Sequence, residues 1–146
     1  MDDPQTFERL TQFFKDSGMQ RNMAKVLAYL LICEPPRQSA GSIEKALSLS
    51  KGSVNTALNS LLLAKLIISY HAQKGRYLEY ELDKDAWLRA VIYRVQSMQT
   101  IIAIADKGIR NNPRNERLIE MRTVYDMFFQ HFKDYLDSLP PSSDRP

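Results

Sequence analysis

The chain has 146 residues, of which 44% are hydrophobic and 25% are charged. These values are typical of a globular domain whose own core holds it together without disulfides or metals. Cys33 is the one cysteine, which excludes an internal disulfide and a multi-cysteine zinc site and fits a reducing cytoplasm. The acidic start lacks the features of a signal peptide, and the longest apolar run, residues 26–33, is far shorter than the roughly 20 residues of a membrane span. We therefore expect a soluble, cytoplasmic protein.

The positive charge is concentrated in one part of the chain. Residues 37–76 contain six basic residues and one acidic residue, whereas the rest of the chain contains 14 basic and 16 acidic residues. A local excess of this kind favours phosphate binding, because lysine and arginine release the counterions condensed around a nucleic acid. The alternative is an ordinary solvated surface that is basic by chance.

Two helices are predicted in the first part of the chain. The first begins after Asp3, a good N-cap followed by proline, and ends at Gly18. The second covers about residues 20–33 and ends before Pro35 and Pro36, which cannot continue a helix. Each carries apolar residues at helical spacing: Phe7, Leu10, Phe13 and Phe14 in the first, and Met23, Val26, Leu27, Leu30 and Leu31 in the second.

Two short helices and a hairpin follow. Ser39 and Ser50 are suitable N-caps for helices over residues 39–47 and 50–65. Residues 66–70 and 77–82 have the aliphatic and aromatic pattern of strands, and Gly75 between them can adopt a turn with positive φ. Two short helices followed by a hairpin with a basic tip are the order of a winged helix-turn-helix.

The last part of the chain predicts two long helices. One runs over about residues 84–109, and the other opens at Asn112 and Pro113. Both repeat apolar residues at heptad spacing, which requires another helix to pack against. The two helices either cover each other or form a dimer interface, and further apolar residues outside the main stripes favour the dimer: Ile92, Ile101, Ile104, Phe129 and Leu136.

The helix over residues 50–65 has one apolar face, made by Val54, Ala57, Leu58 and Leu61. Its other face carries small polar side chains, and no acidic residue occurs between Lys51 and Lys65. Asparagine can bond adenine in two places, serine and threonine can meet bases or phosphates, and lysine meets phosphate or guanine. A plain solvent face usually contains stronger helix formers than Asn, Ser and Thr, so this face indicates contact with the major groove of DNA.

The tip of the predicted hairpin places Lys74 and Arg76 on either side of Gly75. Both cations could reach DNA phosphates, and Arg76 could enter the minor groove. The alternative is a turn that carries charge for solubility alone. The predicted DNA-binding residues are therefore Ser39, Ser50, Lys51, Gly52, Ser53, Asn55, Thr56, Asn59, Lys74 and Arg76.

Three stretches of the sequence resemble the GbsR subfamily of MarR-type winged-helix regulators. They are SIEKALSLSKGSVNTALNSLLLAKLI, GRYLEYEL and DAWLRAVIYR, which includes Asp85 and Trp87, and the resemblance spans about residues 18–109. It implies a homodimer whose two recognition helices enter successive major grooves of a palindromic operator, transcriptional control that is usually repression, and often modulation by a small molecule. Asn55 stands where many members carry serine, so their base preference does not transfer.

The predicted fold is mainly α with a small β-hairpin wing: a winged helix-turn-helix with long N- and C-terminal dimerisation helices. We expect an N-terminal packing or dimerisation helix (1–18), a DNA-binding domain (19–83), two long dimerisation helices (84–139) and a disordered tail (140–146). The predicted dimer residues are Phe7, Leu10, Leu88, Val91, Val95, Met98, Ile102, Leu118, Met121, Tyr125, Phe128 and Phe132.

Catalysis, metal binding and cofactor binding have little support in the sequence. His71 and His131 are far apart and fit no metal-ligand spacing, and Cys33 is better explained as a small apolar residue than as a redox sensor. We therefore expect no enzyme activity, no metal and no cofactor. An effector pocket is predicted at Trp87, Tyr93, Tyr125 and Phe128, although aromatic residues at helical spacing more often belong to a core. The alternative function is a winged-helix module that binds an acidic protein instead of specific DNA.

Overall fold

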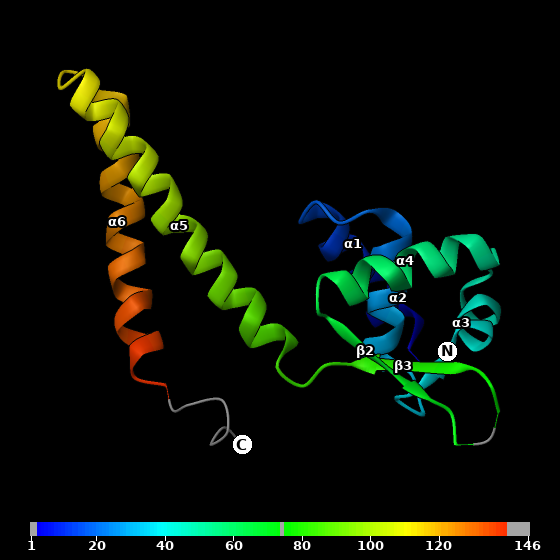
Figure 1. The fold of residues 1–146 in the computed structure, drawn as a ribbon. Coiled ribbons are helices and arrows are strands. Elements are labelled where there is room, and N and C mark those ends of the chain that lie inside the picture. Colours follow the sequence, from blue (N-terminus) through cyan, green and yellow to red (C-terminus); the bar gives the residue numbers. More distant parts are fainter. Residues whose placement is uncertain (1–2, 74, 140–146) are drawn as a thin grey trace. The chain divides into compact units, whose positions relative to one another are not determined.

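The computed structural model describes residues 3–73 and 75–139. The chain forms two compact units, Met1–Ala86 and Trp87–Pro146. The first contains helices α1 to α4 and a small sheet, and the second contains most of helix α5 and all of helix α6 (Figure 1). The predicted mainly α winged helix-turn-helix fold is confirmed.

Helix α1 (Pro4–Asp16) begins and ends as the sequence predicts. The Asp3 side chain accepts a hydrogen bond from the Thr6 backbone N–H at 2.9 Å, and Pro4 occupies the first helical position, where its missing N–H costs nothing. After Ser17 the chain turns at Gly18, whose φ of +92° suits glycine. Phe14 is buried in the core of the first unit, and Phe7 and Leu10 pack against that core.

Helix α2 (Arg21–Ile32) is the centre of the first unit. Gln20 caps its start, and the helix ends ahead of Pro35 and Pro36 as predicted. It packs against α1, α3, α4 and the sheet. Five of its apolar side chains are at most 3% exposed: Ala24, Val26, Leu27, Ala28 and Leu30.

Helices α3 (Ala40–Leu47) and α4 (Lys51–Leu63) form the helix-turn-helix. Ser39 and Ser50 are their N-caps, as the sequence predicts. The turn between them contains Ser48 in the left-handed conformation, with φ 52° and ψ 41°. The apolar face of α4, formed by Val54, Ala57, Leu58 and Leu61, is at most 2% exposed.

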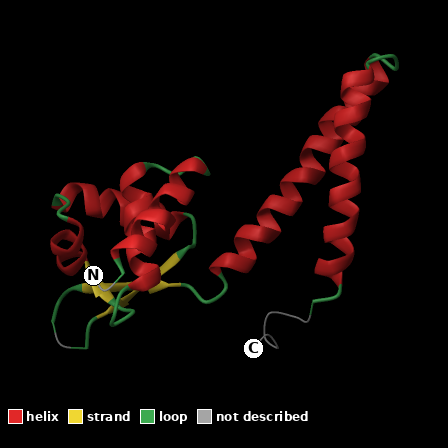
Figure 2. Ribbon diagram, turned by 180° about the vertical axis from the view of Figure 1, so that it is seen from behind, coloured by secondary structure: helices red, strands yellow, loops and turns green. Residues whose placement is uncertain are grey.

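The sheet has three short antiparallel strands in the order β1–β3–β2. Figure 2 shows the strands in yellow beside the helices of the first unit. Strands β2 (Ile67–His71) and β3 (Leu78–Leu82) form the predicted hairpin, and Gly75 in its turn has a φ of +127°. Strand β1 (Gln38–Ser39), which pairs with β3, was not predicted. Two residues after a pair of prolines carry no alternating pattern, so only the long-range pairing defines this strand.

Helices α5 (Ala86–Asn111) and α6 (Glu116–Asp137) are joined by a short turn. The prediction that the second helix opens at Asn112 and Pro113 is wrong. The Asn112 N–H still bonds to the Gly108 carbonyl at the end of α5, and the Asn112 side chain accepts from the Arg114 N–H within the turn. The N-cap of α6 is Asn115, whose side chain accepts from the Leu118 N–H at 3.3 Å.

Near this turn the two long helices are in direct contact. A Cβ atom added to Gly108 would lie 2.7 Å from Cδ1 of Leu118, so the absence of a side chain at Gly108 permits the contact. The Arg122 guanidinium donates to Asp106 of α5 at 2.9 Å and to Asp126 of its own helix at 3.2 Å. The packing of the Leu118 side chain against Gly108 and the forked ion pair of Arg122 therefore hold this part of the hairpin together.

No helix in the described part of the chain is long and apolar enough to cross a membrane.

Replacement of Ser48 by glycine tests the strain in the helix-turn-helix. A residue with a Cβ in the left-handed conformation costs roughly 1–2 kcal/mol, and the greater chain entropy of glycine offsets about half of the gain. We expect Ser48→Gly to raise the free energy of unfolding by up to about 1 kcal/mol, measured by urea titration. Ser60→Gly, within helix α4, is the control and should lower it. A destabilised Ser48→Gly variant would contradict the account of strain.

Candidate nucleic-acid interface

The exposed face of α4 is the centre of the candidate interface. Because its apolar face is fixed in the core, the opposite side chains point away from it. Lys51, Gly52, Asn55, Thr56 and Asn59 are all exposed, and Ser53 is half-buried. The helix has no acidic residue. The result is a polar surface of hydrogen-bonding groups and one cation, without the carboxylates that repel DNA.

The two capping serines already have a structural role. The Ser50 hydroxyl accepts from the Ser53 N–H at 3.2 Å and donates to the Ser53 hydroxyl at 2.9 Å. Ser39 accepts from the Ser42 N–H at 3.1 Å, and the two hydroxyl oxygens are 2.9 Å apart. These contacts fix the first turns of α4 and α3. DNA contacts by Ser39 and Ser50 stay a prediction.

The wing is defined here as the β2–β3 hairpin, residues 67–82. Arg76 is exposed beside the turn, while the predicted contact at Lys74 lies outside the described residues. A Cβ atom on Gly75 would lie 2.6 Å from the Tyr77 ring, so this ring packs closely over the turn. Glycine at position 75 is therefore required both by its φ of +127° and by the neighbouring ring.

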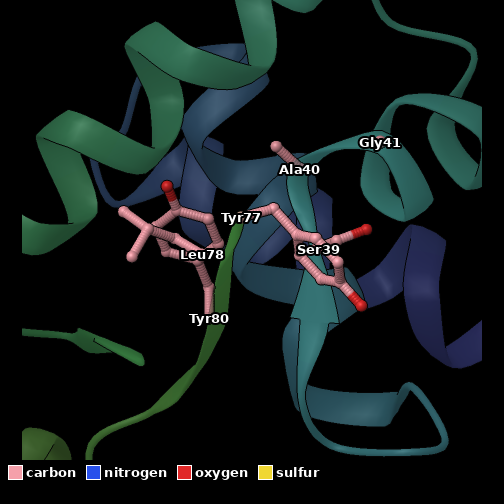
Figure 3. Close-up of a pocket in the computed structure, with 6 residues that line it drawn as sticks. All are labelled: Ser39, Ala40, Gly41, Tyr77, Leu78 and Tyr80. Atoms are coloured by element: carbon pink, nitrogen blue, oxygen red, sulfur yellow. The ribbon is translucent and has the colours of Figure 1, made fainter. Parts of the chain in front are cut away.

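A hollow of about 460 Å³ lies between the wing and the start of α3. Figure 3 shows the side chains around it, which come from β1 and α3 on one side and from β3 and the residue before it on the other. The lining residues are Ser39, Ala40, Gly41, Tyr77, Leu78 and Tyr80. Apart from Ser39, the sequence predicted none of them as site residues, because residues 40 and 80 meet only through the pairing of β1 with β3.

A second, more polar hollow of about 410 Å³ lies beside the wing. Tyr77 borders both hollows and is 49% exposed. The remaining lining residues of the second hollow are Arg37, His71, Ala72, Gln73 and Glu79. The end of the wing next to its turn therefore has one largely apolar and one largely polar surface, and Tyr77 lies between them.

A charged cluster connects the wing to the segment before α3. The Arg37 guanidinium donates to the Glu81 carboxylate at 2.9 Å and lies over the Tyr70 ring, 4.0 Å from its centroid. The hydrogen bond from Arg37 lowers the pKa of Glu81 and raises that of Arg37. The pKa of Tyr70 is raised, mainly by its hydrogen bond with Glu81. Each shift favours the charged pair with a neutral tyrosine.

The four predicted effector residues lie on the long helices. Trp87 and Tyr93 belong to α5, and Tyr125 and Phe128 belong to α6. Their exposed fractions range from 37% to 72%, and none of them lines either hollow described above. An effector pocket at these aromatic residues stays a prediction.

The predicted dimer residues fall into different environments. Val95 and Ile102 are buried, whereas Val91, Tyr125, Phe128 and Phe132 are 36–49% exposed. Helix α6 contains no buried residue although it carries a regular apolar stripe. The other predicted dimer residues are half-buried: Phe7, Leu10, Leu88, Met98, Leu118 and Met121.

The other candidate groups have simple environments. In the residues that the structure describes, no group of three or more His, Cys, Asp or Glu side chains could hold a metal ion. Burial raises the pKa of the Cys33 thiol, which disfavours the reactive thiolate. His131 contacts Phe132 edge to face and His71 borders the polar hollow.

The arrangement of α2, α3, α4 and the wing defines a winged helix-turn-helix protein. Among characterised proteins, the chain is similar to the HTH-type transcriptional regulator MmpR5 of Mycobacterium tuberculosis (strain ATCC 25618 / H37Rv). The two are 28% identical over 122 residues, which cover 80% of this chain and 74% of MmpR5. No family model matches the chain.

The chain is also similar to a solved structure described as a transcriptional regulator. The TM-score is 0.70 and the sequence identity is 25%. The similarity covers 94% of this chain and 97% of the solved one. It therefore includes the long helices as well as the helix-turn-helix and the wing.

Substitution of Gly75 by alanine tests the packing of the wing turn. We expect Gly75→Ala to lower the free energy of unfolding by about 1 kcal/mol or more, because the new Cβ is strained at this φ and meets the Tyr77 ring. Gly52→Ala is the control: its Cβ meets nothing within 4 Å, and helix propensity should stabilise it by about 0.5–1 kcal/mol. Urea titration measures both. Equal effects of the two substitutions would show that the turn tolerates a side chain.

Proposed function

We propose that this chain is a sequence-specific, double-stranded DNA-binding transcriptional regulator that acts as a homodimer. The observation that carries the proposal is the exposed face of α4, which is polar, free of acidic residues and held in place by a buried apolar face. MmpR5 and the solved regulator are both described as transcriptional regulators, which supports the same role for this chain.

In the proposed complex, α4 lies in the major groove. Asn55 and Asn59 can each form two hydrogen bonds with an adenine edge, and Thr56 can contact a base or a phosphate. Lys51 at the start of the helix can neutralise a phosphate. The backbone N–H groups of the first turn of α4 carry the positive end of the helix dipole, which also favours a phosphate. Arg76 on the wing can reach the backbone or the minor groove beside it. Base contacts then supply specificity, while phosphate contacts position the protein.

The proposed dimer rests on the apolar surface of the long helices. Large apolar side chains on α5 and α6 are 36–64% exposed in the single chain, an unusual amount for two neighbouring helices. A second copy of the hairpin would remove this surface from water and give two recognition helices related by a two-fold axis. These side chains are Val91, Ile104, Ile119, Val124, Tyr125, Met127, Phe128 and Phe132.

The finer parts of the proposal rest on the sequence resemblance alone. The stretches that resemble GbsR-like, MarR-type regulators support membership of that group, repression as the mode of control and modulation by a small molecule. The aromatic residues of α5 and α6 are the proposed effector contacts. The palindromic operator follows from the proposed two-fold symmetry.

Alanine substitutions on α4 test whether this helix reads DNA. The probe is a double-stranded site enriched from a random library by repeated binding to the wild-type protein. Asn55→Ala and Asn59→Ala should each weaken binding to this site by about 1–3 kcal/mol for the lost bidentate contact, and Thr56→Ala should weaken it less, while binding to unrelated DNA changes little. Thermal stability should hold or rise, because alanine is the better helix former. Fluorescence anisotropy at a stated salt concentration measures both affinities.

Gln5→Ala is the matched control, since Gln5 is an exposed amide on α1 of the same unit. It should leave both affinities unchanged. Three α4 variants that bind the selected site as the wild type does would rule out this helix as the reader. Failure of the library to enrich any site would favour the protein-interaction module instead.

Sedimentation equilibrium tests the dimer. The wild-type protein should have twice the chain mass of 16.9 kDa at micromolar concentration. Phe128→Glu places a carboxylate in the proposed apolar interface and should raise the dimer dissociation constant at least about tenfold. Gln130→Glu introduces the same charge about 200° around the helix and should leave the dimer intact. A monomeric wild-type protein would contradict the proposal.

A further inference from the structure

Arg37 and Glu81 connect two parts of the first unit that lie far apart in the sequence. Arg37 belongs to the connection between α2 and α3, and Glu81 belongs to the last strand of the wing. The two residues are 44 positions apart, and their Nε and Oε2 atoms are 2.9 Å apart. The contact therefore links the segment that starts the helix-turn-helix directly to the wing.

Tyr70 completes the cluster from the neighbouring strand. The Arg37 guanidinium carbon lies 4.0 Å from the centroid of the Tyr70 ring. Strand β2 pairs with β3 in a register that places Ile68 opposite Glu81 and Tyr70 opposite Glu79. Arg37 thus contacts side chains from both strands of the wing.

The residues that follow Arg37 continue the same connection. Gln38 pairs with Tyr80 and Ser39 pairs with Glu79 in the sheet. The Gln38 side chain, which is 7% exposed, donates to the Pro35 carbonyl at 2.6 Å. Ser39 then caps α3. A continuous series of contacts therefore runs from the start of α3 through Arg37 to the wing.

We propose that Arg37 is a positioning residue that, through Glu81 and Tyr70, holds the wing in the orientation in which Arg76 meets DNA. This inference rests on the proposed DNA-binding function and adds a role that requires no contact between Arg37 and DNA. The Arg37 and Glu81 side chains are 48% and 21% exposed, and ion pairs as exposed as this contribute little to stability. We therefore expect removal of this pair to change the free energy of unfolding little and to act on the geometry of the wing, which Arg37 contacts through both strands.

The depressed pKa of Glu81 agrees with this role. The hydrogen bond from Arg37 is its largest cause, and the nearby charge of Lys84 acts in the same direction. The carboxylate therefore stays ionised at neutral pH, where the protein would bind DNA. Glu79 is the other carboxylate whose charge acts on Arg37.

Glu81→Ala separates positioning from direct electrostatics. Removal of a carboxylate near a DNA-binding surface should by itself strengthen binding, since DNA is negatively charged. The positioning role predicts the opposite: Glu81→Ala and Arg37→Ala should each weaken binding to the selected site about three- to tenfold. Glu79→Ala, two residues earlier on the same strand, is the matched control and should leave binding unchanged or stronger. Thermal unfolding establishes that all variants are folded.

A double-mutant cycle with Arg76 completes the test. If Arg37 acts through the wing, Arg37→Ala should have little further effect once Arg76→Ala has removed the wing contact. Stronger binding by Glu81→Ala together with a reduced salt slope for Arg37→Ala would show that Arg37 contacts phosphate itself and would overturn the inference. Wild-type affinity in Arg76→Ala would overturn it as well. In either case, weaker binding by the α4 variants would still support the proposed function.

Discussion

The burial of one face of α4 is the constraint on which the first unit depends. Val54, Ala57, Leu58 and Leu61 pack with α2 and Ile67 into a core from which water is excluded. This burial fixes the rotation of α4 about its own axis, and the polar side chains are therefore presented outward. A helix with a similar sequence but a weaker apolar face would expose the same residues in no defined direction. Core packing is thus what gives the polar face its geometry.

In the second unit, by contrast, much of the apolar surface is exposed and little of it is buried. Val95, Ile102 and Ala105 of α5 are buried, but no residue of α6 is. The close contact between Gly108 and Leu118 and the ion pair of Arg122 hold the hairpin near its turn. Farther from the turn, aromatic and aliphatic side chains of α6 retain large exposed surfaces. The exposed apolar surface is therefore concentrated in the unit that does not carry the polar helix face.

Much of this fold could be predicted from the sequence, because its signals are local. Asp3, Ser39 and Ser50 cap helices within three residues of themselves, and Gly75 sets its turn through its own φ. Two of the features that were missed depend on distant residues. Strand β1 exists only through β3, and the Arg37–Glu81 contact crosses 44 positions. The α6 cap was misplaced because Asn112–Pro113 and Asn115 are both suitable starts for a helix. In the structure the Asn112 N–H bonds to the Gly108 carbonyl at the end of α5, and Asn115 caps α6.

The same reasoning applies to the candidate site. The face of α4 follows from helical spacing, so its exposed residues could be identified from the sequence. The two hollows beside Tyr77 could not, because residues from the start of α3 and from the wing meet there only after β1 pairs with β3. The sequence contains no periodic pattern that relates these positions.

The connection between α2 and α3 has a consequence for how the chain can vary. Gln38 and Ser39 pair with β3, Arg37 binds Glu81, and Ser39 caps α3, all within three consecutive residues. Insertion of one residue here would move each side chain of β1 to the opposite face of the sheet. It would also displace Ser39 from its position as the N-cap of α3. Surface connections generally tolerate changes in length, but this one has a fixed length. Natural variation in loop length should therefore be found elsewhere, such as at the turn between α5 and α6.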